Sequence, residues 1–475
     1  MNHIQLQSED LPSLRGAELC RANRPAIAPL YSLDGKSLGK SMAPRRRKIE
    51  LPNWGIPVSY AVIAVVVALT LPRFESRWLP SIDSGMSPVA AVVIYSSIAS
   101  GMMSLTGIVF SLVFIMVQFS AIAYSPRLVH WIVRDRVLWH ALGVFTATFL
   151  YALGAIAWLD RNHSGNTPFF SGWLVILLML ASVAMLVALI DRISLFQIRR
   201  MLSLTGDHGR RVIEALYPPL ATPPAITTPE ELKQYPQTQT VVHIGRPRAI
   251  QWLDEKTLLT LSSAAGGIVE VASSAGDFVV EGSELLRVYG GNRQIDEKAL
   301  RHAYGMGGDR TFEQDPKYAF RLLVDIAIKA LSPSINDPTT AVQALDQIED
   351  LLRRLGARQL DIGATRDTSG KLRLVISYPG WEDFLDLAFE EIRSYGANSV
   401  QVMRRMKALV SDLILALPKE RHPPLLHYQQ KLSTSIRRSF ATAEDQQQAS
   451  VEDRQGLGRP RKGSSPQNFQ RADQP

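Results

Sequence analysis

The chain of 475 residues is short of charge and almost without cysteine. Its single cysteine, Cys20, excludes a disulfide-stapled secreted protein. Charged residues make up 20% of the chain, below the usual ~25%. Residues 84–126 and 164–190 contain no Asp, Glu, Lys or Arg at all. Apolar runs of this length exclude both a purely soluble protein and a disordered one.

Sequence motifs for catalysis are also absent. There is no P-loop, no H-E-x-x-H and no G-x-S-x-G, and the nine histidines do not fall at metal-ligand spacings. Residues 305–308, Gly-Met-Gly-Gly, depart from the G-x-G-x-x-G dinucleotide loop and follow no predicted strand. We therefore expect no enzyme, no catalytic residues, no cofactor and no metal site.

Four apolar segments predict a four-helix transmembrane domain within residues 45–191. A spanning helix needs about 20 mostly apolar residues. The first segment reaches that length only if Leu51–Gly55 join it. The second would measure about 46 Å as a helix, so it must tilt or continue beyond a core about 30 Å thick. The segments are Ile56–Leu71, Val89–Phe119, Val137–Leu159 and Phe169–Ile190.

The connecting segments alternate between basic and neutral. Arg and Lys precede the first helix and follow the fourth, whereas the segment with Arg73, Glu75, Arg77 and Asp83 has no net charge. The positive-inside rule then predicts a multi-pass protein of the bacterial inner membrane with both termini in the cytoplasm. Much of the net charge of +8 is explained in this way, and no basic stripe with interleaved aromatics indicates nucleic-acid binding.

The segment between the second and third predicted helices, which the positive-inside rule puts in the cytoplasm, carries four polar residues at the predicted membrane edge. The simplest interpretation is anchoring, and binding of lipid headgroups or gating is the alternative. The four residues are Ser125, Arg127, Asp135 and Arg136.

A row of polar side chains follows the second predicted helix at seven-residue spacing, which keeps it on nearly one face. Two interpretations remain open: small residues that let helices pack closely, and a water-lined path. The other faces, including that of Val109, are expected to contact lipid. The row comprises Ser97, Ser104, Ser111 and Gln118, with Ser100, Gly101 and Gly107 beside it.

Residues 192–440 have ordinary charge and predict a cytoplasmic α+β domain. Residues 240–290 are rich in short predicted strands, and the stretch 276–286 resembles the half-barrel hairpin of lipoyl and biotinyl domains. No Lys lies between Lys256 and Lys298, so the resemblance implies the shape and not the cofactor. Asp315-Pro316 and Asp337-Pro338 each predict the start of a helix.

The turn between those two helices is polar. Ser332, Asn336 and Asp337 favour capping and turn chemistry, with a ligand or interface site as the alternative. Residues 1–44 lack periodicity and a signal-peptide pattern, which indicates a disordered or mis-annotated extension, with Met42 as the expected start. Residues 441–475 predict a disordered tail.

Together these segments resemble the bacterial predicted membrane proteins of domain of unknown function family 2254. The resemblance covers about Leu51 to Leu417. It implies a four-helix membrane domain with a cytoplasmic C-terminal region, and it brings no established activity. Its most specific part is the run Ala330-Leu331-Ser332-Pro333-x-x-Asn336-Asp337-Pro338, and other matches include 143–149 and 276–279.

Two function classes follow. In the first, several copies assemble around the second helix as a conduit for ions or small solutes, gated by the cytoplasmic domain. In the second, the helices only anchor and oligomerise, and the cytoplasmic domain senses a ligand or holds a partner protein, neither of which the sequence identifies. Four helices exceed what an anchor needs, which favours the conduit. The predicted partners are the lipid bilayer and further copies of the chain.

Overall fold

The computed structural model describes residues 54–78, 85–123, 136–161, 167–193, 198–220 and 229–457. The predictions for residues 1–44, including Met42 as the start, lie outside the described residues. So does the part of the predicted tail from residue 458 onward.

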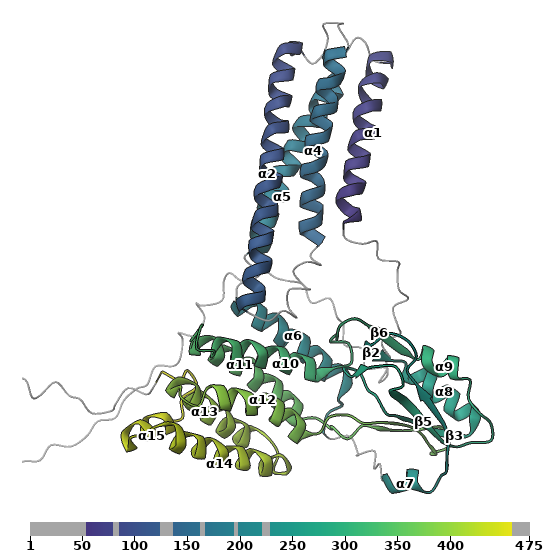
Figure 1. The fold of residues 1–475 in the computed structure, drawn as a ribbon, viewed down its shortest axis with the longest axis vertical. Coiled ribbons are helices and arrows are strands. Elements are labelled where there is room, and N and C mark those ends of the chain that lie inside the picture. Colours follow the sequence, from purple (N-terminus) through teal and green to yellow (C-terminus); the bar gives the residue numbers. More distant parts are fainter. Residues whose placement is uncertain are drawn as a thin grey trace, which may run out of the picture. The chain divides into compact units, whose positions relative to one another are not determined.

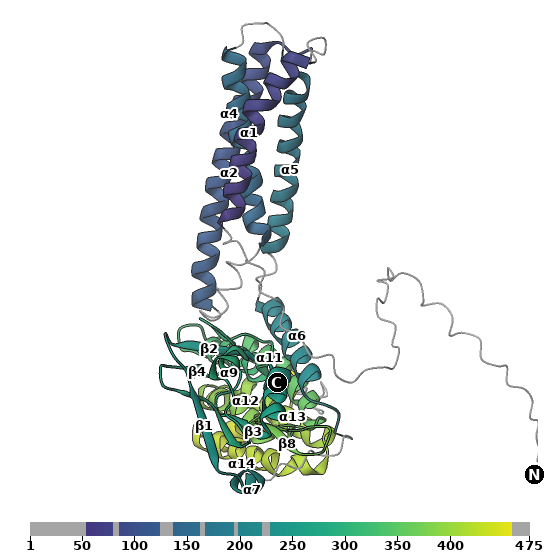
Figure 2. The same cartoon turned by 90° about the vertical axis from the view of Figure 1, so that its right-hand side faces the viewer.

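Four long apolar helices form the N-terminal part and confirm the predicted candidate spans (Figures 1 and 2). Each is long and apolar enough to cross a membrane. Both views show them side by side as a bundle. They are α1 (Gly55–Trp78), α2 (Pro88–Ala123), α4 (Arg136–Arg161) and α5 (Phe169–Ile193).

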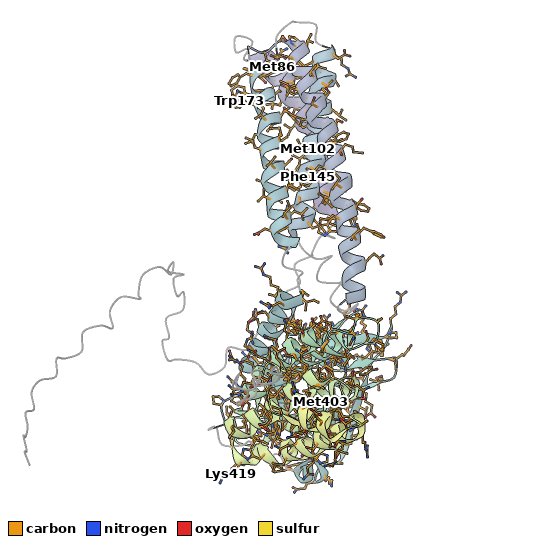
Figure 3. All side chains as sticks on the ribbon, turned by 90° about the vertical axis from the view of Figure 1, so that its left-hand side faces the viewer. Met86, Met102, Phe145, Trp173, Met403 and Lys419 are labelled. Atoms are coloured by element: carbon orange, nitrogen blue, oxygen red, sulfur yellow. The ribbon has the colours of Figure 1, made fainter. Side chains whose placement is uncertain are left out.

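The helix α4 holds the bundle together because it contacts each of the other three. Its small residues permit close approach: Gly154 lies against Ala68 of α1, and Gly143 lies under the ring of Tyr60. Aromatic side chains separate into two environments. Phe145 of α4 is fully buried, whereas Trp173 of α5 projects outward (Figure 3).

The C-terminal domain confirms the predicted mixture of helices and strands. One sheet has five strands in the order β1-β5-β3-β8-β7, antiparallel except for the pair β3 and β8. A second has three antiparallel strands in the order β4-β2-β6. Neither sheet closes. The strands are β1 (Gln237–Val242), β2 (Arg248–Leu253), β3 (Gly267–Val271), β4 (Phe278–Val279), β5 (Glu284–Gly290), β6 (Tyr304–Gly307), β7 (Ala364–Arg366) and β8 (Leu372–Ile376).

The β-rich segment of residues 240–290 therefore contributes strands to both open sheets. In the stretch 276–286, β4 pairs with β2 while β5 pairs with β1 and β3, so these two strands do not pair with each other. Three short helices accompany the sheets: α7 (Pro229–Lys233), α8 (Glu255–Ala265) and α9 (Glu297–His302). Asp254 caps α8 by accepting the amide of Thr257.

The remaining helices of the C-terminal domain surround an apolar core of large aliphatic and aromatic side chains, among them Phe320, Phe384 and Phe389. The two predicted Asp-Pro starts are confirmed, because Asp315 and Asp337 accept amides in the first turns of α10 and α11. The elements are α6 (Ile198–Leu216), α10 (Pro316–Ala330), α11 (Pro338–Gly356), α12 (Trp381–Tyr395), α13 (Val400–Ala416), the 3₁₀ helix η2 (Lys419–Arg421), α14 (His422–Ser439) and α15 (Ala443–Ser450).

The helix α15 corrects the predicted boundary at residue 441. It packs on α13 and α14, and its Ala449 is fully buried. Thr442 caps it by accepting the amide of Asp445. The polar composition of α15 does not predict this packing, because Ala449 is the one buried residue of the helix.

Candidate functional site

The polar row of α2 faces away from the other three helices of the chain. The face of α2 inside the bundle carries Ala91, Tyr95, Ala99 and Val109, each at most 4% exposed. The prediction that Val109 contacts lipid is wrong, because this residue is 2% exposed. The row itself is exposed at every position: Ser97, Ser100, Ser104, Ser111 and Gln118.

The row divides into a part within the candidate span and a part beyond it. The apolar span covers Pro88–Ile115, whereas α2 continues to Ala123. Thirty-six residues of helix measure about 54 Å, so α2 extends well past a hydrocarbon core. Gln118 lies on this extension, which separates it from the three serines at seven-residue spacing.

The hydroxyl of Ser97 donates a hydrogen bond to the carbonyl of Val93 at 2.8 Å. Such a bond to its own helix satisfies the hydroxyl without a partner helix or water. Of the predicted membrane-edge residues, Arg136 is the first residue of α4 and is exposed. Ser125, Arg127 and Asp135 lie outside the described residues.

The turn between α10 and α11 is built by local hydrogen bonds. Asp337 accepts the amide of Thr340 at 3.1 Å and also its hydroxyl, at 2.5 Å. Ser332 donates to the carbonyl of Lys329 at 2.7 Å and accepts two amides through its own carbonyl. Asn336 has a φ of +48°, a conformation that asparagine tolerates better than most side chains. These bonds fit the capping interpretation.

A carboxylate lies buried in the bundle, in a segment that the sequence predicts as a loop. Glu75 is 2% exposed because α1 continues through Pro72 to Trp78. Its two oxygens accept the amides of Phe170 at 2.7 Å and Ser171 at 3.1 Å, at the start of α5. Glu75 thereby links the end of α1 to the beginning of α5.

Three hydroxyl side chains from the other helices gather around Glu75. The hydroxyl of Tyr95 of α2 lies beside Gly172, the residue after Ser171, where an added β-carbon would come 2.9 Å from it. Tyr151 of α4 packs in the same buried cluster as Tyr95. Tyr151 is fully buried and lies near Ser171 of α5, which is 3% exposed. The two hydroxyls face each other, but neither makes a hydrogen bond of ordinary length with any described residue. We call Glu75, Tyr95, Tyr151 and Ser171 the four-helix oxygen cluster.

One signal could have found Glu75. The first apolar segment was too short for a span, and extension toward the C-terminus would have included it. Pro72 argued against that extension because proline removes a helical hydrogen bond. In the structure Arg73 donates to the carbonyl of Leu69 at 2.8 Å, and the helix continues.

The C-terminal domain contains a cavity of about 920 Å³ between β8 and the start of α12. Its wall is mixed, with Leu360, Val375 and Trp381 beside Tyr378 and Arg421. Tyr378 donates to Glu255 at 2.9 Å, and burial raises the pKa of that carboxyl above its usual range. Arg421 stacks on Trp381 and donates to the carbonyls of Gly356 and Arg358, which gives it a capping role at the end of α11.

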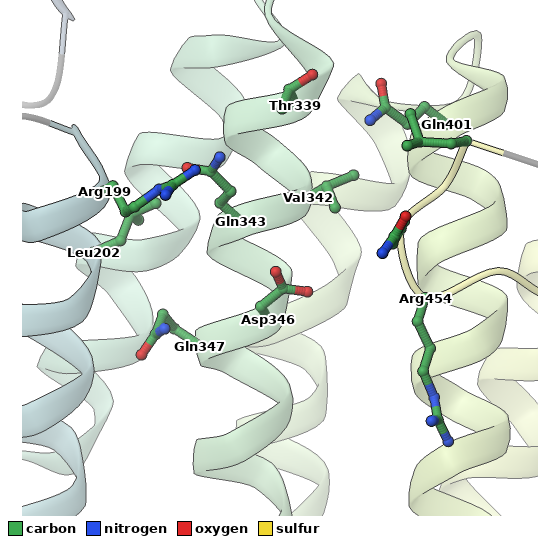
Figure 4. A pocket seen from close by; sticks show the side chains of 11 residues that line it. Arg199, Leu202, Thr339, Val342, Gln343, Asp346, Gln347, Gln401 and Arg454 are labelled. Carbon is green, nitrogen blue, oxygen red and sulfur yellow. The ribbon is translucent and has the colours of Figure 1, made fainter. Parts of the chain in front are cut away.

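A smaller cavity, of about 500 Å³, lies between α6, α11 and the C-terminal segment (Figure 4). Its lining is largely amide and charged, with Arg199 on one side and Arg454 on the other. Asp346 accepts a hydrogen bond from Arg405 at 2.9 Å, and Arg454 pairs with Asp412. Within the described residues no group of three or more His, Cys, Asp or Glu side chains is placed to hold a metal ion.

Comparison with known proteins agrees with this architecture. The model of the predicted membrane protein family DUF2254 matches residues 52–412. The chain belongs to this family. Uncharacterised proteins of Mycobacterium bovis and Mycobacterium tuberculosis are 25% identical to this DUF2254 protein over 372 residues, which cover 76% of this chain and 70% of theirs. No solved structure matches the chain significantly.

Proposed function

We propose that this DUF2254 protein forms an oligomeric conduit for ions or small solutes, with α2 of each copy lining a polar path. The observation that supports the proposal is the exposed row of Ser97, Ser104 and Ser111 on a helix otherwise rich in large apolar residues. In this proposal the membrane is the bacterial inner membrane, and the C-terminal domain lies in the cytoplasm and gates the path.

The glycines of α2 support a second copy as the neighbour of this face. A β-carbon added to Gly101 or Gly107 would meet nothing within 4 Å. The bundle glycines differ, since an added β-carbon at Gly143 or Gly154 would come within 3 Å of α1. Small residues at uncovered positions permit close approach by another helix.

Cysteine labelling tests the conduit. In a Cys20→Ser background, Ser97→Cys, Ser104→Cys and Ser111→Cys are treated with a charged thiol reagent in intact membranes. Met103→Cys and Phe110→Cys are matched controls, because both side chains are more than half exposed and lie about 100° or more around α2 from the middle of the row. Labelling of the row with unlabelled controls supports a water-filled path. Protection of the row, with disulfide cross-links between copies, would leave a packed seam and overturn the conduit.

A second candidate function is ligand sensing by the C-terminal domain. The cavity between β8 and α12 has the volume of a small-molecule site and lies where sheet and helices meet. Filling it by Ser377→Trp should abolish any ligand-induced rise in unfolding temperature found by screening small molecules. Thr365→Trp on the neighbouring strand β7 serves as the control outside the cavity lining. A screen in which no compound stabilises the wild type would remove this candidate.

A further inference from the structure

We propose that the four-helix oxygen cluster is a binding site for a monovalent metal cation inside the transmembrane bundle. The site combines the Glu75 carboxylate with the hydroxyls of Tyr95, Tyr151 and Ser171, one oxygen-bearing side chain from each helix. It does not depend on the conduit, because α2 presents Tyr95 to the bundle and its serine row to the opposite side.

Glu75 carries a charge that no basic side chain among the described residues pairs with. Among the described residues no Lys, Arg or His lies within salt-bridge distance of this carboxylate, although it is 98% buried. The basic residues nearest to it in sequence, Arg73 and Arg77, are exposed, and so are Asp160 and Arg161 at the end of α4. A carboxylate removed from water is costly unless it is paired or binds a metal. Ionisable residues within membrane spans mark functional sites by default.

The amides of α5 compensate only part of that charge. A helix N-terminus is equivalent to about half a positive charge, so a substantial negative charge remains. Each carboxylate oxygen accepts one amide and keeps a second lone pair. The side of Glu75 not used by α5 can therefore receive a cation.

Two buried hydroxyls beside Glu75 point to a ligand independently of its charge. Tyr151 and Ser171 are more than 95% buried and lie near each other, yet neither hydroxyl makes a hydrogen bond of ordinary length with a described residue. Unsatisfied buried polar atoms of this kind indicate a missing partner such as an ion or water. Their lone pairs, together with the carboxylate, form an all-oxygen donor set, which suits hard cations. A single negative charge matches a monovalent ion rather than a divalent one.

A bound cation would tie the ends of all four helices together, so binding should stabilise the folded bundle by mass action. The experiment uses full-length protein in detergent at fixed pH and ionic strength. Its unfolding temperature is compared in sodium, lithium, potassium and choline chloride. We expect a higher and saturable unfolding temperature in at least one alkali salt than in choline.

Two variants locate the effect. Tyr151→Phe removes one donor oxygen and keeps the ring, so at least a tenfold higher salt concentration should be needed for half of the stabilisation. Tyr60→Phe is the matched control, since Tyr60 contacts His140 elsewhere in the bundle, and it should respond as the wild type does. Glu75→Gln should abolish the cation dependence.

Several results would overturn the site. Equal unfolding temperatures in choline and in every alkali salt would do so, as would a response to pH without a response to alkali ions. Cation dependence that Tyr151→Phe leaves unchanged would place the ion elsewhere. If Glu75→Gln does not fold, the comparison of Tyr151→Phe with Tyr60→Phe decides.

Discussion

Gly276 lies directly against the carboxylate of Asp315, so that a β-carbon on the glycine would clash with Oδ2. Gly276 has a φ of +95° and precedes β4, whereas Asp315 is 3% exposed and caps α10. Arg310 completes the contact by donating to the same oxygen through Nε at 2.8 Å. One glycine thus joins the three-stranded sheet to the helical core of the C-terminal domain.

Gly276→Ala should lower the free energy of unfolding by about 2–4 kcal/mol, because a positive φ strains alanine and the new methyl group displaces a buried carboxylate. Gly282→Ala is the control, since its φ is +84° but a β-carbon there would meet nothing within 4 Å. It should cost about 1–2 kcal/mol from the backbone alone. Chemical unfolding of the two variants measures the difference, and equal losses would contradict the contact with Asp315.

Arg310→Met should destabilise the domain in a pH-dependent way. Burial raises the pKa of Asp315 even though Arg310 opposes it, so the ionised carboxylate is costly in the folded state. Without the arginine the loss at neutral pH should be about 1–3 kcal/mol, below the value for a fully buried pair because Arg310 is 36% exposed. The loss should shrink as the pH falls and Asp315 takes up a proton, since the neutral acid does not need the cation. A loss independent of pH would indicate packing alone.

The helices of this fold could be predicted well where caps and periodicity agree. Both predicted Asp-Pro signals begin helices, α10 and α11. Strand β1 begins at Gln237, three residues before the predicted β-rich segment of residues 240–290, because pairing with β5 and not side-chain polarity sets its length. Apolar periodicity cannot give the orientation of α2, since large apolar residues surround its serine row, and this is why Val109 was misplaced.

The candidate sites were predictable only in part. The serine row and the α10–α11 turn are visible as patterns within one segment. The four-helix oxygen cluster is not, because it takes one side chain from each of four helices. Its carboxylate lies beyond Pro72 and between two arginines, a context typical of a loop.

Glu390→Gln tests a charged contact between α12 and α14. Burial would raise the pKa of Glu390, but hydrogen bonds from Lys431 and Arg393 outweigh it and lower the pKa to about 2. Because its pKa is lower in the folded than in the unfolded protein, Glu390 stabilises the folded state at pH values above its unfolded pKa of about 4.3. That stabilisation is lost as the pH falls through about 2.

The cost of Glu390→Gln at pH 7 should be at most about 1 kcal/mol because the pair is about one-third exposed, and it should fall with added salt. Glu382→Gln on the same helix is the control, since Glu382 makes no ion pair with a described residue. Thermal unfolding between pH 2 and 7 measures both. A difference that persists at pH 2 would contradict the electrostatic origin.

Asp337→Ala tests whether the α10–α11 turn is structural. Losing the cap of α11 should cost about 1 kcal/mol, whereas Asp337→Asn keeps an oxygen for the amide of Thr340 and should cost less. If Asp337→Ala abolishes a ligand or partner interaction that Asp337→Asn and an equally destabilised variant both retain, the turn is an interaction site. If stability alone changes, capping explains the motif.

Thr148 and Ser182 provide a test of the bundle itself. Their hydroxyls lie 2.9 Å apart between α4 and α5, and each also has a carbonyl acceptor on its own helix. Because each hydroxyl keeps that acceptor when the other is removed, the coupling energy between Thr148→Val and Ser182→Ala should be only about 0.6 kcal/mol. A double-mutant cycle of unfolding in mixed micelles measures it. A coupling energy well above 2 kcal/mol would mean that this hydrogen bond, and not the packing of the small residues of α4, is the main interaction that holds α4 to α5.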